Sequence, residues 1–396
     1  MQRLEKRQIS PHCILSCLYF LLLPTTIAVY SVGNSFLKLA TIPIGLFFLV
    51  SLIFSNKKFQ INSVHLALAV YTLTVVATLF YDADEISILY VTGYILNAAL
   101  YICLSVIPYN KDELELMEFV QIILLVILNL MALLSGGSED SRTTLVILGQ
   151  TSDPNYFVGF FIFPLTVAMK KLVSGKHTIF YLLLIAASCY SVFLSGSRGG
   201  FLAVVVTIAG FALLYPSGIL KRMLFFFGGL AALLLLWAVL KPILPENIVE
   251  RMRLEEVVET GGTGRMDIWK SIIKEIVNQP ERLLFGRGID ATHGIFINGS
   301  WTQVVAHNHL LQLLYNQGIV GTLAFLVLVG ICFFRCCKNR KTVAIAMIGM
   351  MALSISLTFN QTTRTFWNLI AYAAFVFPDS DISTVNNGGL SDNEHA

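Results

Sequence analysis

A polar interval runs from Lys241 to Asn308 and separates two apolar parts of the chain. Near its middle stands Thr263-Gly264-Arg265-Met266-Asp267-Ile268-Trp269, and it closes on Ala306-His307-Asn308-His309-Leu310, where apolar sequence resumes. Nearly every other part of the chain is an apolar run or a short connection between two runs. The apolar runs therefore decide the fold, and the polar interval is the main place for chemistry.

The composition excludes a soluble globular protein. Of the 396 residues, 56% are hydrophobic and only 13% are charged, whereas soluble domains carry about 25% charged residues. The mean hydropathy is +0.74. A formal charge of +3 is too small to indicate a nucleic-acid partner. We therefore expect a polytopic membrane protein that is surrounded by membrane lipids.

The apolar runs predict an all-α fold. A bilayer core needs roughly 20 apolar residues per helix, and these unalternating runs exclude a transmembrane barrel. We predict about 12 transmembrane helices and one large extracytoplasmic loop. The helices are expected near residues 13–31, 36–54, 63–81, 86–108, 116–135, 155–169, 178–196, 199–215, 223–241, 309–334, 342–359 and 366–378. The runs 155–169 and 366–378 are short for a span.

The basic residues predict the orientation. Arg3, Lys6 and Arg7 precede an apolar run that resembles a signal peptide, but because many spans follow, we interpret this run as an uncleaved first helix. Lys and Arg then gather in alternate short loops, as they do on the cytoplasmic side. We expect both termini in the cytoplasm, with residues 1–241 forming helices 1–9, 242–308 the outer loop, 309–378 helices 10–12, and 379–396 a disordered tail.

The first candidate site is Ser195-Gly196-Ser197-Arg198-Gly199-Gly200, between two apolar runs. An arginine at bilayer depth is energetically costly unless it meets an anion or a water-filled cavity. The glycines allow a bulky group to approach the backbone, and they also suit a tight turn. An anion site and a turn whose arginine reaches lipid phosphates remain open as interpretations.

Arg265 is the second candidate. It follows a glycine-rich segment and begins an amphipathic pattern that ends before Pro280. Backbone N–H groups, the helix dipole and a guanidinium converge at such a position, which favours an anion. A solvated helix end is the alternative, because the loop contains other arginines. They are Arg251, Arg253, Arg282 and Arg287, of which Arg287 is the reserve anion ligand.

His307 is the third candidate, at the point where the loop re-enters the membrane. Histidine titrates near neutral pH and can accept a proton from a hydroxyl nucleophile. An interfacial histidine bound to a headgroup or a loop carbonyl is the alternative. His309 would face another side if the segment is helical, so we expect only one of the two to line the site. His293 is a weaker rival.

Two further polar segments carry weaker signals. Asp82-Ala83-Asp84 offers carboxylates for a divalent cation, although such pairs are usually solvated. Asp153-Pro154-Asn155-Tyr156 offers sugar hydrogen bonds or a helix cap. The seven cysteines imply no disulfide framework or CxxC metal site. Without Walker A, HExxH or GxSxG motifs, ATP-driven transport, zinc proteolysis and serine hydrolysis lack support.

Together, the motifs resemble the O-antigen ligase and O-antigen polymerase superfamily over roughly residues 60 to 375. The resemblance rests on Leu194-Ser195-Gly196-Ser197-Arg198-Gly199-Gly200-Phe201, on Gly264-Arg265 with Trp269, on His307-Asn308 with Leu310, Gly318 and Gly321, and on Asp153 and Asn155. Each motif alone is loose, but their order, spacing and common outer face are fairly specific.

The resemblance implies a GT-C-like glycosyltransferase of the bacterial cytoplasmic (inner) membrane that assembles surface polysaccharide of the cell envelope. It implies transfer of a glycan from an undecaprenyl-diphosphate-linked donor to an acceptor hydroxyl on a glycan, lipid or protein, with inversion and without metal or cofactor. Arg198 and Arg265 would hold the diphosphate, and His307 would act on the hydroxyl. The further substrate contacts are assigned to Arg287, Asp153, Asn155, Trp269 and His309.

The motifs do not distinguish a polymerase from a ligase. A transporter or flippase of lipid-linked oligosaccharide is the alternative in another class. Transporters place ionisable residues near the membrane midplane, often in two related halves, whereas here the candidates lie at the outer boundary and no halves are evident. A scaffold without chemistry would need the arginines only for phosphate headgroups.

Overall fold

The computed structural model describes most of the chain. The described residues are 9–27, 34–55, 57–134, 146–147, 150–151, 153–216, 218–252, 264–289, 295–297, 300–302, 304–360 and 363–375. The tail predicted to be disordered, 379–396, and the rival His293 lie outside them, as does part of the predicted outer loop.

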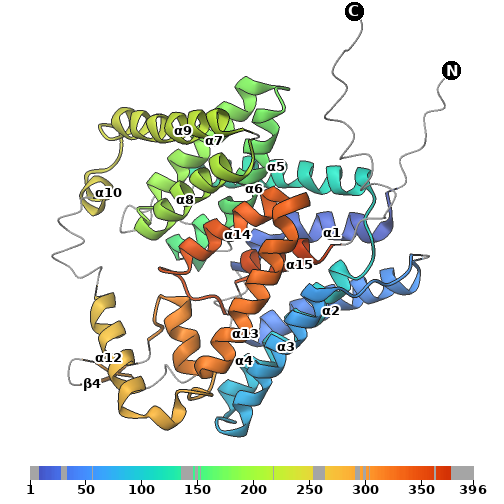
Figure 1. The fold of residues 1–396 in the computed structure, drawn as a ribbon, viewed down its shortest axis with the longest axis vertical. Coiled ribbons are helices and arrows are strands. Elements are labelled where there is room, and N and C mark those ends of the chain that lie inside the picture. Colours follow the sequence, from blue (N-terminus) through green and yellow to red (C-terminus); the bar gives the residue numbers. More distant parts are fainter. Residues whose placement is uncertain are drawn as a thin grey trace, which may run out of the picture.

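Helices make up nearly all of the regular structure in these residues (Figure 1). They are α1 Pro11–Leu21, α2 Asn34–Ile53, α3 Ser63–Ala77, α4 Glu85–Ser105, α5 Lys111–Leu134, α6 Pro154–Val173, α7 Thr178–Leu194, α8 Arg198–Leu214, α9 Ile219–Leu240, α10 Glu246–Arg251, α12 Arg265–Asn278, α13 His309–Asn339, α14 Lys341–Leu353 and α15 Arg364–Ala374, with short 3-10 turns at Leu23–Ile27, Thr78–Phe80 and Pro280–Arg282. Two short antiparallel ribbons complete the set: β1 Val146–Ile147 with β2 Gln150–Thr151, and β3 Ile295–Ile297 with β4 Ser300–Thr302.

The predicted all-α membrane fold is confirmed in outline. Each of the predicted runs contains a helix, whereas α10 and α12 belong to the polar interval. Within the described residues, six helices are long and apolar enough to cross a membrane: α3 with its 3-10 extension, α4, α5, α6, α9 and α13. Shorter apolar helices include α1, α7, α8 and α14. The number of spans therefore stays a prediction.

The helices pack against one another to different extents, and α9 is the least buried of the six candidate spans. Helix α8 lies along α14, where Gly349 allows Thr207 to approach its backbone. Helix α9 lies across the top of the bundle in Figure 1 and buries little of its surface. An apolar cavity of about 390 Å³ lies between α6, α7, α8 and α9, with Cys189 and Phe211 among its lining residues.

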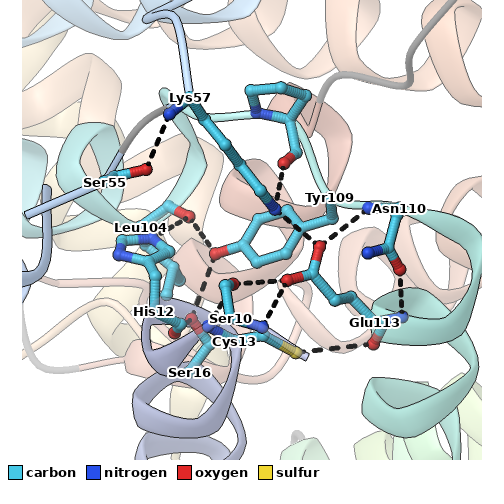
Figure 2. Close-up of polar contacts among 11 residues, drawn as sticks. Ser10, His12, Cys13, Ser16, Ser55, Lys57, Leu104, Tyr109, Asn110 and Glu113 are labelled. Carbon is cyan, nitrogen blue, oxygen red and sulfur yellow. Dashed lines mark hydrogen bonds and ion pairs between the residues drawn. The ribbon is translucent and has the colours of Figure 1, made fainter. Parts of the chain in front are cut away.

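Figure 2 shows a polar cluster around Glu113, at the beginning of α5. The Glu113 side chain is fully buried. It accepts hydrogen bonds from the backbone N–H of Ser10 at 3.0 Å and of Asn110 at 2.8 Å, and it forms a 2.7 Å ion pair with Lys57. A buried carboxylate needs such compensation. The cluster ties the beginnings of α1 and α5 to the loop that follows α2.

A break in α13 was not predicted from the apolar run 309–334. Gly318 has φ 63° and ψ −163°, which interrupts the helix. The loop after Arg282 fills the gap, because the N–H groups of Ile319 and Val320 donate to the carbonyls of Leu283 and Leu284 at 2.9 and 3.0 Å. Irregular backbone at membrane depth is stable when protein groups satisfy it in this way. The break anchors the end of the polar interval to the bundle.

Candidate functional site

The turn before α8 presents Arg198 at the beginning of a helix. Gly196 has φ 58°, a conformation that glycine adopts readily. Ser197 caps α8 by accepting a 2.9 Å hydrogen bond from the N–H of Gly200. Its hydroxyl also donates a 2.6 Å hydrogen bond to the side-chain oxygen of Asn155. The turn is thus fixed both to its own helix and to the beginning of α6.

Asp153 and Asn155 form the cap of α6. The Asp153 carboxylate accepts a 2.7 Å hydrogen bond from the N–H of Asn155. Asn155 is 4% exposed, and its oxygen receives the Ser197 hydroxyl. Asp153, in contrast, is exposed beside the site. The structure therefore places Asn155 as the support of the Arg198 turn and leaves only the Asp153 carboxylate accessible.

Gly199 and Gly200 allow close packing within the protein. A Cβ on Gly199 would overlap the side chain of Ser356, which follows α14, and one on Gly200 would press against Val158 of α6. The beginning of α8 therefore packs directly on α6 and on the segment that follows α14. In the sequence, these glycines suggested that a bulky group approaches the backbone. In the structure, the groups that approach Gly199 and Gly200 are side chains of the protein itself.

Arg198 contacts the short helix α10. Its Nε donates a hydrogen bond to the main-chain carbonyl of Arg251, the last residue of α10. The final carbonyls of a helix lack partners within the helix and carry partial negative charge, so they are natural acceptors for a guanidinium. This contact connects the α7–α8 turn to the polar interval.

Arg265 begins α12 and shares the site with Arg198. Its N-cap, Gly264, has φ 80° and no side chain to cap the free N–H groups. Burial lowers the pKa of Arg265, the nearby Asp153 carboxylate raises it, and the charges of Arg198 and Arg251 lower it further. These interactions bring together residues from α6, α8, α10 and α12. Several cations thus converge around one carboxylate.

His307 lies beside this cluster in an unusual backbone conformation. Its φ is 47°, which is uncommon outside glycine and often marks functional positions. Burial lowers the pKa of His307, the charge of Arg265 lowers it further, and Asp153 opposes both effects. The imidazole is therefore held in its neutral, proton-accepting form near neutral pH.

The residue before His307 is held on both sides. The indole Nε1 of Trp269 donates a 2.7 Å hydrogen bond to the carbonyl of Ala306, and the N–H of Ala306 donates a 2.8 Å hydrogen bond to the side-chain oxygen of Gln312. Ala306 is fully buried against Ile272 of α12. Trp269 therefore supports the histidine turn with its indole nitrogen.

His309 points away from this cluster. It is 1% exposed, and its ring packs at 4.5 Å from the ring of Phe325 and 4.9 Å from that of Phe359. Its Nδ1 accepts a 3.2 Å hydrogen bond from the N–H of Phe359. The structure thus separates the two histidines: His307 lies among the cations, and His309 lies in the core.

Arg287 also has a different environment from Arg198 and Arg265. It forms a 2.9 Å ion pair with Glu275 and lies 5.0 Å over the ring of Tyr315. Its backbone N–H donates to the carbonyl of Tyr315 at 3.1 Å, next to the break in α13. Arg287 thus fastens the loop to α12 and α13, and the geometry favours Arg265 as the partner of Arg198.

The two acidic residues of the Asp82 loop have local partners. Asp82 accepts a 2.9 Å hydrogen bond from the Ser87 hydroxyl, and Asp84 caps α4 through the N–H of Ser87 at 2.6 Å. No cluster of His, Cys, Asp or Glu within the described ranges is arranged to hold a metal ion. The charges that gather at the site are those of arginines and of Asp153.

Sequence reasoning missed two contributors to this arrangement. Arg251 was only one of several arginines in the interval, and Gln312 was one polar residue within a helix. Neither position carries a distinguishing signal in the sequence. Arg251 is reached by Arg198, which lies 53 residues earlier, and Gln312 acts through a hydrogen bond from the N–H of Ala306 that residue type does not predict.

One comparison with known proteins matches the region that contains the candidate site. The family model described as O-antigen ligase matches residues 182–326, a segment that includes Arg198, Arg251, Arg265 and His307. No curated protein matches the chain. Over this segment, the match confirms the predicted resemblance to the O-antigen ligase and polymerase superfamily.

Proposed function

We propose that this protein, whose resemblance to the O-antigen ligase and polymerase superfamily is confirmed, transfers a glycan from undecaprenyl diphosphate to an acceptor hydroxyl at the outer face of the bacterial cytoplasmic membrane. One observation carries the proposal. Arg198 donates a hydrogen bond to the carbonyl that ends α10, and α12, which begins at Arg265, holds the His307 turn through Trp269. The three residues are thus brought to one site, where the charge of Arg198 lowers the pKa of Arg265 and that of Arg265 lowers the pKa of His307.

Arg198 and Arg265 hold the donor diphosphate. Their guanidinium groups stay charged and bind phosphate oxygens in pairs. Negative charge develops on the diphosphate as it leaves, and fixed cations in a partly buried site stabilise that charge. The uncapped amino terminus of α12 adds N–H groups directed at the same anion.

His307 accepts the proton of the acceptor hydroxyl. The hydroxyl oxygen forms a bond to the anomeric carbon while the bond from that carbon to the diphosphate oxygen breaks, and the proton passes to His307. Attack opposite the leaving group inverts the anomeric centre. The lowered pKa of His307 keeps it neutral before the reaction. A positioned base contributes about a hundred- to ten-thousand-fold in rate.

The other predicted site residues act indirectly. Asn155 holds the Arg198 turn, Trp269 holds the His307 turn, and Arg287 fastens the adjoining loop. His309 anchors the beginning of α13 through its N–H, which donates a 2.8 Å hydrogen bond to the carbonyl of Ser354. Asp153 moderates the positive charge of the site. Since the leaving group is stabilised by guanidinium groups, we expect transfer to continue in EDTA.

The polyprenyl tail of the donor approaches from the lipid. Arg198 stands at the beginning of α8, whereas the apolar cavity between α6, α7, α8 and α9 lies toward the other end of that helix. A polar site at the end of an apolar bundle suits a substrate whose head is polar and whose tail is hydrocarbon. The outward orientation rests on the alternation of basic loops.

The flippase alternative receives little support from the broken helix α13. Broken helices mark substrate sites in many transporters. Here the loop that contains Leu283 and Leu284 occupies the break and satisfies its backbone groups. The candidate residues gather at helix ends rather than around Gly318.

Analysis of lipid-linked glycans in a deletion strain tests the proposal. Loss of the protein is expected to leave glycan on undecaprenyl diphosphate at the outer face, accessible to added glycosidase. Accumulated single repeat units would indicate a polymerase, and full-length unattached chains a ligase. Accumulation only on the cytoplasmic side would contradict the transferase and support a flippase.

A further inference from the structure

Helix α10 packs against the turn that carries Arg198. Ile248 is fully buried and, with Leu244, contacts Phe193 near the end of α7. Trp237 of α9 joins the same apolar group. The position of α10 is therefore fixed by side chains on the helix that leads into the Arg198 turn. Arg251, the last residue of α10, is carried to the site by this packing.

The main chain and the side chain of Arg251 have separate roles. Its carbonyl accepts the hydrogen bond from Arg198 Nε. Its own Nε is buried and has no hydrogen-bond partner in the part of the chain that the structure describes. An unsatisfied buried donor on a cation is costly and indicates a missing acceptor.

The charges around Arg265 are unbalanced. The groups that shift its pKa are two cations, Arg198 and Arg251, and one anion, Asp153. With Arg265 itself, this group contains three guanidinium groups and one carboxylate, a formal charge of +2. A diphosphate diester carries roughly two negative charges at neutral pH and offers several oxygens to guanidinium groups.

We propose that the Arg251 side chain is a third ligand of the donor diphosphate, beside Arg198 and Arg265. This inference rests on the proposed function and adds to it the charge of the substrate group that the site accepts. Two arginines beside Asp153 would leave one negative charge of the diphosphate unmatched. With Arg251 the site and the diphosphate are neutral together, which a site of low dielectric requires.

Kinetics of the full-length protein in liposomes test this role. Arg251→Gln and Arg251→Met remove the charge but keep the main-chain carbonyl that binds Arg198. We expect both variants to raise the KM for polyprenyl-diphosphate-linked glycan about tenfold or more, with a smaller effect on kcat. The inhibition constant of inorganic pyrophosphate should rise by a similar factor. Arg251→Lys should recover part of the loss.

Arg282→Gln is the matched control, because it removes the same charge from an exposed position in the same loop. It should leave the KM and the pyrophosphate inhibition constant unchanged. Melting temperatures identify variants that fail to fold, and Arg251→Met keeps an unbranched side chain at the end of α10. If a folded variant retains the wild-type KM and inhibition constant, the role of Arg251 is overturned.

Two further measurements separate related explanations. If Arg251 binds a phospholipid headgroup instead, a higher fraction of phosphatidylglycerol in the liposomes will weaken the inhibition of the wild type by pyrophosphate. An inhibition constant that does not change with the phosphatidylglycerol fraction supports the donor site. If the wild type releases no polyprenyl diphosphate at all, the proposed function fails. If the wild type releases polyprenyl diphosphate normally and the Arg251 variants keep the wild-type KM and inhibition constant, the proposed function stands. Only the role of Arg251 as a third ligand is then refuted.

Discussion

The indole nitrogen of Trp269 donates a 2.7 Å hydrogen bond to the carbonyl of Ala306, the residue before His307. Trp269 stands one turn after Arg265 on α12. One helix therefore presents Arg265, the proposed diphosphate ligand, at its beginning and supports the proposed base from its second turn. In the proposed mechanism, anion binding and proton transfer share this support.

Replacement of Trp269 by phenylalanine removes this hydrogen bond and keeps an aromatic ring. A hydrogen bond of this kind contributes about 0.5–1.5 kcal/mol, so we expect kcat to fall roughly 2- to 10-fold with little change in the KM for the donor. The control is the same replacement in a His307→Asn background. If Trp269 acts through His307, the second substitution causes no further loss; an equal loss in both backgrounds would contradict that role.

Replacement of Asp153 by asparagine should move the acidic limb of the kcat/KM profile to lower pH. The carboxylate raises the pKa of His307, so its removal lowers that pKa and the imidazole stays neutral in more acidic solution. Asparagine preserves the cap of α6. Asp267→Asn, at an exposed position in the first turn of α12, is the control. A limb that moves to higher pH would show that another group controls the rate.

Replacement of Gly199 by alanine should disturb the Arg198 turn. The new methyl group would overlap the Ser356 side chain, and overpacking of this kind costs about 1–3 kcal/mol. We expect a lower melting temperature and a higher KM for the donor. Ser356→Gly in the same chain removes the clash and should restore both quantities. Absence of rescue would show that Gly199 is needed for another reason.

Replacement of Gly318 by alanine should destabilise the junction between α13 and the loop. The backbone conformation at Gly318 costs other residues about 1–3 kcal/mol, and a Cβ there would lie 2.5 Å from the carbonyl group of Leu284. A Cβ on Gly330, further along α13, would meet no atom within 4 Å. Thermal unfolding should therefore show a clear loss for Gly318→Ala and none for Gly330→Ala. Equal melting temperatures would contradict the described junction.

Hydropathy predicted the helices of the bundle well because burial in lipid depends on residue type alone. The break at Gly318 was not predictable in this way. A glycine inside an apolar run does not alter the pattern, and the groups that stabilise the break come from Leu283 and Leu284, some thirty-five residues earlier. The apolar signal identifies helices, whereas their interruptions depend on contacts between segments.

The candidate site was partly predictable for a similar reason. Arg198 and His307 stand at boundaries between polar and apolar sequence, and Arg265 begins an amphipathic pattern after a glycine-rich segment. Both are local signals. The different environments of Arg251 and Arg287 are not local. Arg287 pairs with Glu275 across a turn, whereas Arg251 reaches the site because Ile248 packs on Phe193. The sequence singled out Arg287 as the reserve anion ligand and assigned no role to Arg251, and only tertiary structure shows their different environments.

Release of polyprenyl diphosphate by the purified protein tests the central claim most directly. His307→Asn removes the base and keeps a residue that accepts a left-handed backbone. His177→Asn is the matched control, because His177 has a similar φ of 54° and is exposed in the turn before α7. With a polyprenyl-diphosphate-linked glycan and an acceptor, we predict that His307→Asn lowers the release rate about a hundred- to ten-thousand-fold and that His177→Asn leaves it unchanged. Release by folded His307→Asn at the wild-type rate would contradict the account.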